Sequence, residues 1–339
     1  MNNRQTDILN AVLIILSLAL AFLLPFELFV FSYVVLGPLH YLTEINWLNG
    51  RSFFVARKKW IWVFLILCII ISLPAILRFP VFAEWKDRTA IKQVTTIISK
   101  SFPVIILGML FFAVGLIYLK KQSHILMALI ASMFSAFLII HYVPYSFIIA
   151  GIFLPTIVHV YLFTLLFMLS GTLANKSKPG IIAVVLLMIC PLVIILFPLP
   201  ALEYAIPGSS ESAYIINRFS TLNIHLAKLL KPFGLDNYQQ MSAAGIRIQI
   251  FIAFCYTYHY LNWFSKTSII GWNKSMTKPA TFIILTLWIG SLLLYWYNTR
   301  IGYTALFFLS ITHVFLEFPL NIVSIKGISS RFRSALHRS

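Results

Sequence analysis

Long apolar runs alternate with short polar segments along almost the whole chain. Runs close to the roughly 17 to 25 residues needed to cross a bilayer occupy residues 8–24, 27–47, 60–78, 102–119, 124–141, 147–173, 181–198, 245–264, 280–298 and 302–324. Continuous hydrophobicity over such lengths indicates transmembrane helices. The pattern therefore predicts an all-α, polytopic membrane helix bundle of about ten transmembrane helices, in which residues 1–339 form a single transmembrane domain.

The one long polar interruption, at 199–244, is predicted to be external and to contain an interfacial helix. Within it, residues 212–231 place apolar side chains at helical spacing, with Arg218 and His225 among the polar positions between them. Such a pattern is typical of a helix that lies in the plane of the membrane surface. Because proline breaks helices, we expect this helix to end before Pro232.

Composition excludes the soluble classes of protein. The chain is 60% hydrophobic and 10% charged, with a mean hydropathy of +0.91, whereas soluble domains are about 25% charged. The net charge of +17 does not indicate nucleic-acid binding, because the basic residues are scattered through short loops, where they meet anionic lipid headgroups. Sixteen of them fall on one side of the ten-helix scheme and eight on the other, which predicts that both termini are cytoplasmic.

Four of the predicted spans contain a histidine, although ionisable groups inside a membrane are costly unless they face a polar interior. These residues are His40, His159, His259 and His313. All four helices run from outside to inside, and at about 1.5 Å per residue their imidazoles fall within roughly 5 Å of one depth. The matched depth predicts that the four rings meet around a metal ion. Interhelical hydrogen bonding is the alternative role for each ring.

Two glutamates strengthen the metal interpretation. Glu44 follows His40 by four residues and Glu317 follows His313 by four, so each pair shares one helix face. Imidazole nitrogen together with carboxylate oxygen suits iron, manganese or zinc, and a divalent cation compensates for carboxylates in an apolar span. The glutamates either bind the metal directly or orient ligating histidines. For Glu44, a position at the cytoplasmic interface is an equal alternative.

Further polar and aromatic residues lie close to these histidines in the sequence. Tyr256 and Asn262 share a helix face with His259 at a spacing of three, and are candidates for additional ligands or for groups that support the ligands. Candidates for the wall of a substrate channel are Tyr258, Trp263, Phe315 and Phe318. Packing and anchoring at the membrane interface are the alternative roles for such aromatic residues.

Three segments carry a resemblance to a known family. They are residues 37–48 (GPLHYLTEINWL), 258–263 (YHYLNW) and 313–319 (HVFLEFP). They resemble bacterial membrane proteins identified as β-carotene central-cleavage oxygenases, which are grouped with the Brp/Blh-type retinal-forming enzymes. The chain differs from the better-studied members of that group in carrying two His-x-x-x-Glu pairs where they carry a His-x-x-x-His pair.

The resemblance implies an all-helical enzyme of the bacterial inner membrane that cleaves β-carotene with dioxygen to give retinal. It also implies a single non-haem Fe(II) held by histidines from several spans, which in this chain are His40, His159, His259 and His313. We therefore expect a metal-dependent oxygenase. Its expected partners are the lipid bilayer, a carotenoid or related isoprenoid lipid, and dioxygen, and another divalent metal in place of iron is an open alternative.

The residues by themselves leave other functions open. A transporter or proton-coupled permease would use the His/Glu pairs to relay protons, although the chain lacks the related halves with paired Gly or Pro interruptions that are typical of such folds. Four histidines and two glutamates also provide enough ligands for a di-iron lipid desaturase or hydroxylase. A haem protein with two axial histidines and a purely structural membrane subunit are the remaining alternatives.

Overall fold

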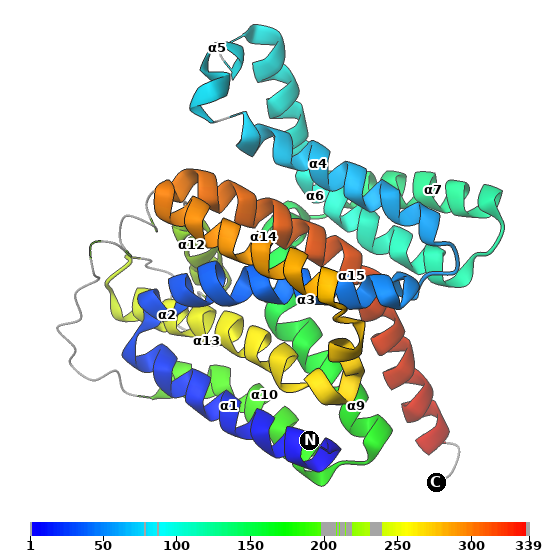
Figure 1. Cartoon of the computed structure of the whole chain (residues 1–339), viewed down its shortest axis with the longest axis vertical. Coiled ribbons are helices and arrows are strands. Elements are labelled where there is room, and N and C mark those ends of the chain that lie inside the picture. Colours follow the sequence, from blue (N-terminus) through cyan, green and yellow to red (C-terminus); the bar gives the residue numbers. More distant parts are fainter. Residues whose placement is uncertain are drawn as a thin grey trace. The chain divides into compact units, whose positions relative to one another are not determined.

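The computed structural model describes residues 2–77, 79–86, 88–197, 208, 210, 214, 219–230 and 239–336. These residues form helices joined by turns and short loops, with no strand among them, so the all-α prediction is confirmed. The α-helices, labelled in Figure 1, are α1 (Asn3–Leu23), α2 (Pro25–Phe31), α3 (Gly37–Gly50), α4 (Ile61–Ile76), α5 (Ala83–Lys86), α6 (Thr89–Tyr118), α7 (Gln122–Tyr142), α8 (Ser146–Ile148), α9 (Thr164–Asn175), α10 (Lys178–Leu196), α12 (Ser220–Leu229), α13 (Ala243–Ser265), α14 (Lys278–Tyr297) and α15 (Thr299–Leu336).

Other helical segments connect or extend these helices. Three are wound as π-helices, with i→i+5 hydrogen bonds, and they are η1 (Ser32–Leu36), η5 (Ile149–Phe163) and η7 (Thr267–Gly271). Four are short 3₁₀ turns, namely η2 (Ser52–Phe54), η3 (Lys58–Trp60), η4 (Pro80–Phe82) and η8 (Trp272–Ser275). The segments η1 and α3 continue α2, and η5 joins α8 to α9, so each series makes one long helical stretch.

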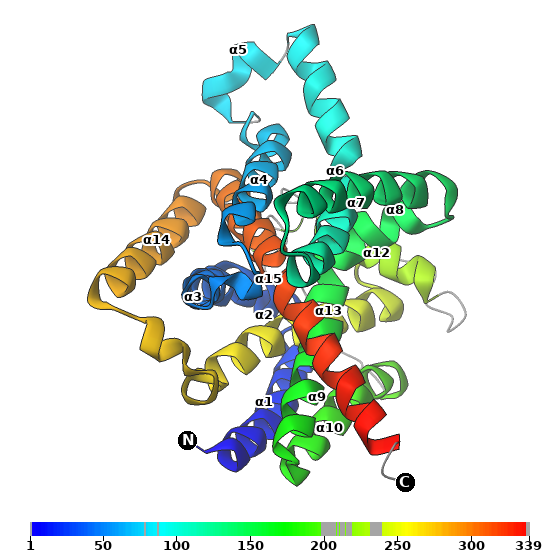
Figure 2. The same cartoon turned by 90° about the vertical axis from the view of Figure 1, so that its right-hand side faces the viewer.

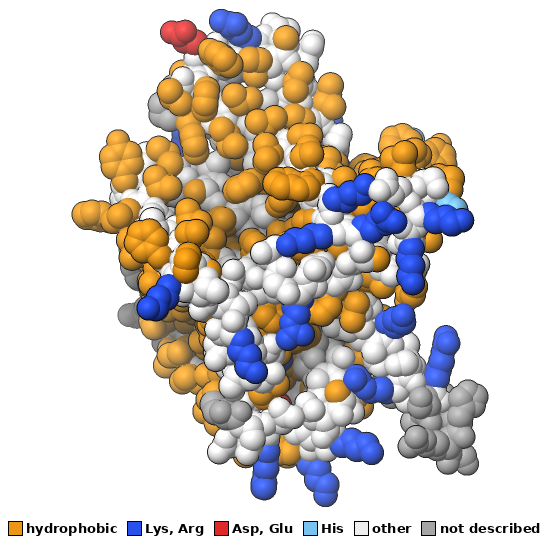
Figure 3. Space-filling view, turned by 45° about the vertical axis from the view of Figure 1, so that its right-hand side comes forward, with side chains coloured by type: hydrophobic (Ala, Val, Ile, Leu, Met, Phe, Trp, Pro, Cys, Tyr) orange, Lys and Arg blue, Asp and Glu red, His pale blue; other side chains and the backbone are white. Residues whose placement is uncertain are grey.

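Nine helical stretches in the described part of the chain are long and apolar enough to cross a membrane. They are Asn3–Leu23, Pro25–Gly50, Lys58–Ile76, Thr89–Tyr118, Gln122–Tyr142, Ser146–Asn175, Lys178–Leu196, Lys278–Tyr297 and Thr299–Arg331. Each overlaps one predicted span. Hydrophobic side chains cover much of the molecular face in Figure 3, as expected where helices meet lipid.

The chain divides into two compact units. Unit 1 comprises Met1–His40, Val160–Lys274 and Gly327–Ser339, and unit 2 comprises Tyr41–His159 and Ser275–Lys326. A single transmembrane domain and a cytoplasmic position for both termini stay predictions from the sequence.

Helix α13 is the central element of unit 1 and corresponds to the eighth predicted span, 245–264. Its 23 residues would suffice to cross a bilayer, yet it is not among the nine most apolar stretches. It packs against α1, α2, η1, α10 and α12, and Figure 1 shows it beside α1 and α2. Protein surrounds this helix, so polar side chains on it find partners: Gln249 donates to the Pro25 carbonyl (2.9 Å) and Thr257 hydrogen-bonds Ser32 (2.7 Å).

The predicted interfacial helix at 212–231 overlaps α12 in unit 1. Its buried positions include Asn223 and Leu226, and Asn223 donates to Gln249 of α13 at 2.9 Å. Burial, with a smaller contribution from the charge of Lys228, lowers the pKa of His225. Arg218 and the predicted stop at Pro232 lie outside the described residues.

Unit 2 is built on the close pair of helices α6 and α7, which lie side by side in Figure 2. Gly108 and Gly115 permit this approach. A Cβ atom on Gly108 would lie 2.7 Å from the Met133 sulfur, and one on Gly115 would lie 2.9 Å from the Cβ of Ala128. Small residues at such contacts are typical of helices that pack in membranes. Helix α4 packs against α6.

Candidate metal centre

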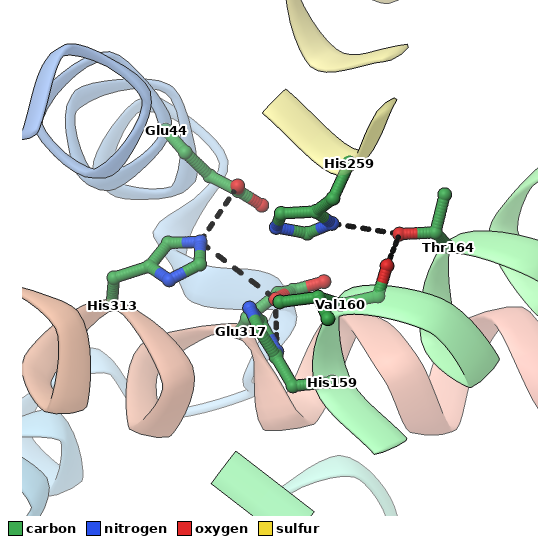
Figure 4. A network of polar contacts seen from close by, with 7 residues as sticks. All are labelled: Glu44, His159, Val160, Thr164, His259, His313 and Glu317. Atoms are coloured by element: carbon green, nitrogen blue, oxygen red, sulfur yellow. Dashed lines mark hydrogen bonds and ion pairs between the residues drawn. The ribbon is translucent and has the colours of Figure 1, made fainter. Parts of the chain in front are cut away.

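Unit 2 brings two imidazoles and two carboxylates together in its interior. Glu44 comes from α3, His159 from η5, and His313 and Glu317 from α15, and these four residues form the His–Glu cluster (Figure 4). None of the four is more than 8% exposed, and His313 is 0% exposed. Ionisable groups buried this deeply in apolar helices must compensate one another or bind an ion.

Each carboxylate of the cluster contacts an imidazole from another helical segment. The Oε2 atom of Glu44 lies 3.0 Å from Nε2 of His313, and Oε2 of Glu317 lies 3.2 Å from Nδ1 of His159. Glu317 also lies 3.8 Å from Nε2 of His313, one turn earlier on α15. The rings of His159 and His313 meet edge to face, with centroids 4.9 Å apart. A chain of polar contacts therefore links all four residues.

Prolines alter the backbone close to two of these residues. His159 lies four residues after Pro155 in η5. Proline has no N–H with which to complete an α-helical bond, and this favours a local change of winding. Pro319 follows Glu317 by two residues inside α15, where it removes a backbone hydrogen bond and favours a bend. The segment that carries His159 is thus π-helical at the cluster, whereas α15 runs through Pro319 as an α-helix.

One aromatic ring contacts the His–Glu cluster, and further buried rings lie next to it along α15. The Tyr41 ring lies against His313, with centroids 4.9 Å apart. Phe315 and Phe318, which the sequence indicates as channel-wall or packing residues, are both 0% exposed and stack on each other at 5.7 Å. Phe64 of α4 meets the edge of Phe315 at 6.3 Å. Apolar surroundings of this kind strengthen every electrostatic contact inside them.

The donor atoms of the cluster fit a metal ion. His159, His313 and Glu317 each offer one ligand atom, and these atoms lie within 4.8 Å of one another. Metal bonds to nitrogen or oxygen of about 2.0–2.2 Å place neighbouring ligand atoms about 3 to 3.5 Å apart, close to the observed 3.2 and 3.8 Å. Two histidines and one carboxylate are a ligand set typical of non-haem Fe(II) sites with open positions.

Unit 1 holds the other two predicted histidines, His40 of α3 and His259 of α13, as a second pair of rings. Their centroids are 4.7 Å apart and the planes are nearly perpendicular, at 81°; we call these residues the histidine pair. They are 1% and 7% exposed. The ring of His40 also contacts Tyr260 at 5.2 Å and Trp263 at 5.6 Å. The surroundings of His40 are thus rich in aromatic rings.

The contacts of Thr164 indicate which ring nitrogen of His259 carries the proton. The Thr164 hydroxyl donates its single proton to the Val160 carbonyl at 2.9 Å, and its oxygen lies 2.7 Å from Nδ1 of His259 (Figure 4). The two bonds can coexist only when Nδ1 of His259 carries the proton that Thr164 accepts. Nε2 is then the basic nitrogen of the ring. Histidines that bind metals are commonly held in this way through their other nitrogen.

Tyr256 and Asn262, the two other polar candidates on α13, are both buried. The ring of Tyr256 packs perpendicular to that of Phe29, with centroids 5.2 Å apart. The side-chain oxygen of Asn262 is buried and accepts no hydrogen bond from the described residues. The Asn262 oxygen is therefore available to accept a hydrogen bond one turn after His259.

Tyr258 and Trp263, the channel-wall candidates on α13, are engaged in packing and hydrogen bonding. The Tyr258 hydroxyl donates to the side-chain oxygen of Asn10 at 3.1 Å and also lies 3.0 Å from the sulfur of Met168. Trp263 stacks on Trp272 at 6.1 Å. These contacts agree with the packing alternative.

Two residues at the site had no role in the sequence interpretation. Thr164 carries no signal of its own, because threonine is common in membrane helices and its partner His259 lies 95 positions away. Tyr41 adjoins His40, and it lies three residues before Glu44. Helical spacing therefore places Tyr41 and Glu44 on the same side of α3, and this was the available signal for its position beside His313.

Comparison with protein-family models, curated proteins and solved structures yields no match to this chain. The resemblance to carotene-cleaving membrane enzymes therefore stays a prediction from the three sequence segments.

Proposed function

We propose that the chain is a non-haem iron oxygenase embedded in the bacterial inner membrane, acting on a carotenoid or a related isoprenoid lipid. The observation that carries this proposal is the buried set of His159, His313 and Glu317, whose donor atoms lie within 4.8 Å of one another. A set of two imidazoles and one carboxylate suits Fe(II) and leaves positions open. The apolar helices around it suit a substrate that arrives from the lipid.

Each residue of the His–Glu cluster has a defined part in this proposal. His159, His313 and Glu317 would hold the iron, and Glu44 would fix the ring of His313 through the 3.0 Å contact or act as a further ligand. Phe315 and Phe318 would keep water from the site and face a polyene. Iron, when bound, supplies oxidation chemistry with dioxygen that no side chain of the chain offers.

Elemental analysis of the detergent-purified protein tests the metal. We expect close to one iron per chain, with most of it lost in His313→Ala and in His159→Ala. His141→Ala is the matched control, since it removes an exposed histidine from α7 of the same unit. The sequence prediction also counts His40 and His259 as ligands, and His40→Ala and His259→Ala test that part. A folded, metal-free protein would overturn the proposal.

Expression in a host that accumulates β-carotene tests the substrate. We expect the pigment to bleach and retinal to appear, and we expect the His313→Ala variant to leave the pigment unchanged. If the protein contains iron but β-carotene persists, the carotenoid assignment fails while the metal centre stands. Isoprenoid quinones and shorter polyenes would then be the next substrates to test.

A proton-coupled permease is the second candidate, and one observation favours it. Glu44, His313, Glu317 and His159 follow one another at 3.0, 3.8 and 3.2 Å, as the members of a proton relay do. Reconstituted into vesicles without added metal, a permease would move protons in response to a gradient, and Glu317→Gln would stop that movement. A di-iron desaturase or hydroxylase would instead give two irons per chain in the elemental analysis.

A further inference from the structure

A cavity of about 240 Å³, lined by both polar and apolar residues, lies in unit 1. Its walls come from the first turns of α1, from α9, from the segment after α13 and from the end of α15. The lining residues that matter for its chemistry are Thr6, Asp7, Asn10, Phe167, Lys266 and Arg331. The cavity is smaller than the roughly 300 Å³ or more of pockets for drug-sized ligands, so it suits a small group.

Two cations line this cavity, and they are held differently. Arg331 is anchored, because its Nη1 donates to the Ser170 carbonyl at 3.0 Å. The guanidinium keeps its remaining N–H groups for other acceptors. The ammonium of Lys266 lies 4.5 Å from the centre of the Phe167 ring. No hydrogen bond or ion pair of this ammonium joins it to another described residue.

The other polar groups of the cavity are partly committed. Asp7 accepts a hydrogen bond from the Ser177 hydroxyl at 2.5 Å. The Asn10 amide donates to the Thr6 carbonyl, and its oxygen accepts from Tyr258 and Ser265. Thr6 is 0% exposed, and its hydroxyl has no hydrogen-bond partner among the described residues. A buried hydroxyl without a partner destabilises the fold unless something else fills that position.

We propose that this cavity binds a phosphate group, held by Lys266 and Arg331 and completed by the Thr6 hydroxyl. Two cations against one carboxylate leave the cavity with a net positive charge. A phosphate oxygen accepts from an ammonium, a guanidinium and a hydroxyl alike, which a halide or a neutral ligand does less well. The cavity lies at the end of the unit that the charge distribution assigns to the cytoplasm, where free phosphate and anionic lipid headgroups both occur.

Burial disfavours the charged form of Lys266 when no anion lies beside it. It lowers the pKa of Lys266 to about 7, with the charge of Asp7 acting in the opposite sense. Asp7 of α1 and Arg331 of α15 are the other charged residues of the lining. A phosphate beside Lys266 would favour the protonated amine and so raise the pKa of this amine again.

Phosphate-dependent thermal stabilisation of the intact protein tests the proposal. The first arm adds inorganic phosphate to protein in phosphatidylcholine nanodiscs, with chloride at matched ionic strength as the reference. The second arm omits phosphate and replaces part of the phosphatidylcholine with phosphatidylglycerol. Stabilisation in the first arm identifies free phosphate as the ligand, and stabilisation in the second arm alone identifies a lipid headgroup.

Lys266→Ala and Arg331→Ala are each expected to weaken the midpoint ligand concentration about tenfold or more, because each removes a charge-assisted hydrogen bond. Lys274→Ala removes an exposed cation just beyond the same segment and should leave the response unchanged. Thr6→Val keeps the side-chain shape. It should leave the ligand-free protein as stable as before or more so, yet reduce the stabilisation by phosphate.

The proposal fails if the unsubstituted protein responds in neither arm, or if Lys274→Ala weakens the response as much as Lys266→Ala does. It also fails if Thr6→Val destabilises the ligand-free protein and leaves the phosphate response intact. None of these outcomes depends on iron, since His313→Ala is expected to keep the full response to phosphate.

Discussion

The His–Glu cluster of unit 2 and the histidine pair of unit 1 share one ring arrangement but have different neighbours. The ring centroids are 4.9 and 4.7 Å apart, and both pairs are nearly perpendicular, at 83° and 81°. In unit 2 the rings contact carboxylates at 3.0 and 3.2 Å. In unit 1 one ring contacts a hydroxyl at 2.7 Å and the other contacts aromatic rings.

The two sets of rings are packed alike, so we infer that any difference in their chemistry comes from their neighbours. Carboxylates bring negative charge into an apolar interior, so the His–Glu cluster needs protons or a cation for compensation. The hydroxyl and the aromatic rings that contact the histidine pair bring no net charge, so these contacts do not by themselves require a proton or a cation. Substitutions in the two places should therefore differ in kind, metal loss in one and loss of stability in the other.

The largest effect is expected from Glu317→Gln, which keeps the shape of the side chain and removes its charge. Glu317 contacts both His159 and His313, so we expect the purified protein to lose nearly all of its iron, with at least a hundredfold weaker affinity. Substitution of groups that only support a metal ligand costs about 10- to 100-fold, and a direct ligand should exceed that range. Elemental analysis after dialysis against defined Fe(II) measures it.

Glu84→Gln, at an exposed position of unit 2, is the control and should keep its iron. A second measurement compares the thermal stability of Glu317→Gln with that of the unsubstituted protein after a chelator has removed the metal from both. Glu317→Gln removes a buried carboxylate, so it should unfold at the same temperature as the unsubstituted protein or at a higher one. Retained iron combined with a loss of stability would assign Glu317 to hydrogen bonding of His159 alone.

Glu44→Gln is expected to have the next largest effect, a loss of about 10- to 100-fold in iron affinity. Its carboxylate lies 3.0 Å from Nε2 of His313, and an amide in its place holds the ring less strongly because it carries no charge. Isothermal titration of metal-free protein with Fe(II) measures the change. An affinity equal to that of the unsubstituted protein would remove Glu44 from the site and restrict it to packing.

The sequence predicted the helices well, because long apolar runs have few other structures open to them. Helix α13 is an exception among the predicted spans. It forms at the expected place, but its Gln249 and Thr257 side chains hydrogen-bond other segments of unit 1. The site was predicted as a set of residues and not as a set of contacts. Spacing along α15 places Glu317 near His313, yet its shortest contact is with His159. Pairing between distant segments depends on packing, which one-dimensional spacing does not encode.

Thr164→Val tests the histidine pair. We expect a smaller effect, a loss of about 1 to 3 kcal/mol in the free energy of unfolding. The substitution keeps the shape of the side chain but leaves the Nδ1–H of His259 without the acceptor that Thr164 provides, and a buried donor that loses its partner costs about that much. Thr164→Ser should restore most of the stability. Chemical denaturation in detergent measures both variants.

The iron content of Thr164→Val sharpens the comparison further. If His159, His313 and Glu317 suffice, the variant should bind iron as the unsubstituted protein does. A tenfold or greater loss of iron would instead make His259 a ligand that Thr164 orients, and the proposed contrast between the two sets of histidines would be wrong.

Lys266→Met should have the smallest effect on stability. The pH dependence of this effect reports on a buried positive charge in unit 1, in contrast to the buried carboxylates of unit 2. Burial lowers the pKa of Lys266 to about 7, while a lysine in the unfolded chain titrates near 10.4. Between these values the unfolded chain binds the additional proton, so the stability of the unsubstituted protein rises with pH. Below about pH 7 both states are protonated and the full penalty for burying the charge applies.

The variant should therefore melt at a higher temperature than the unsubstituted protein at acidic pH in phosphate-free buffer, and this advantage should vanish near pH 10. Lys274→Met should show no such trend. A constant difference at every pH would mean that the amine of Lys266 is fully hydrated.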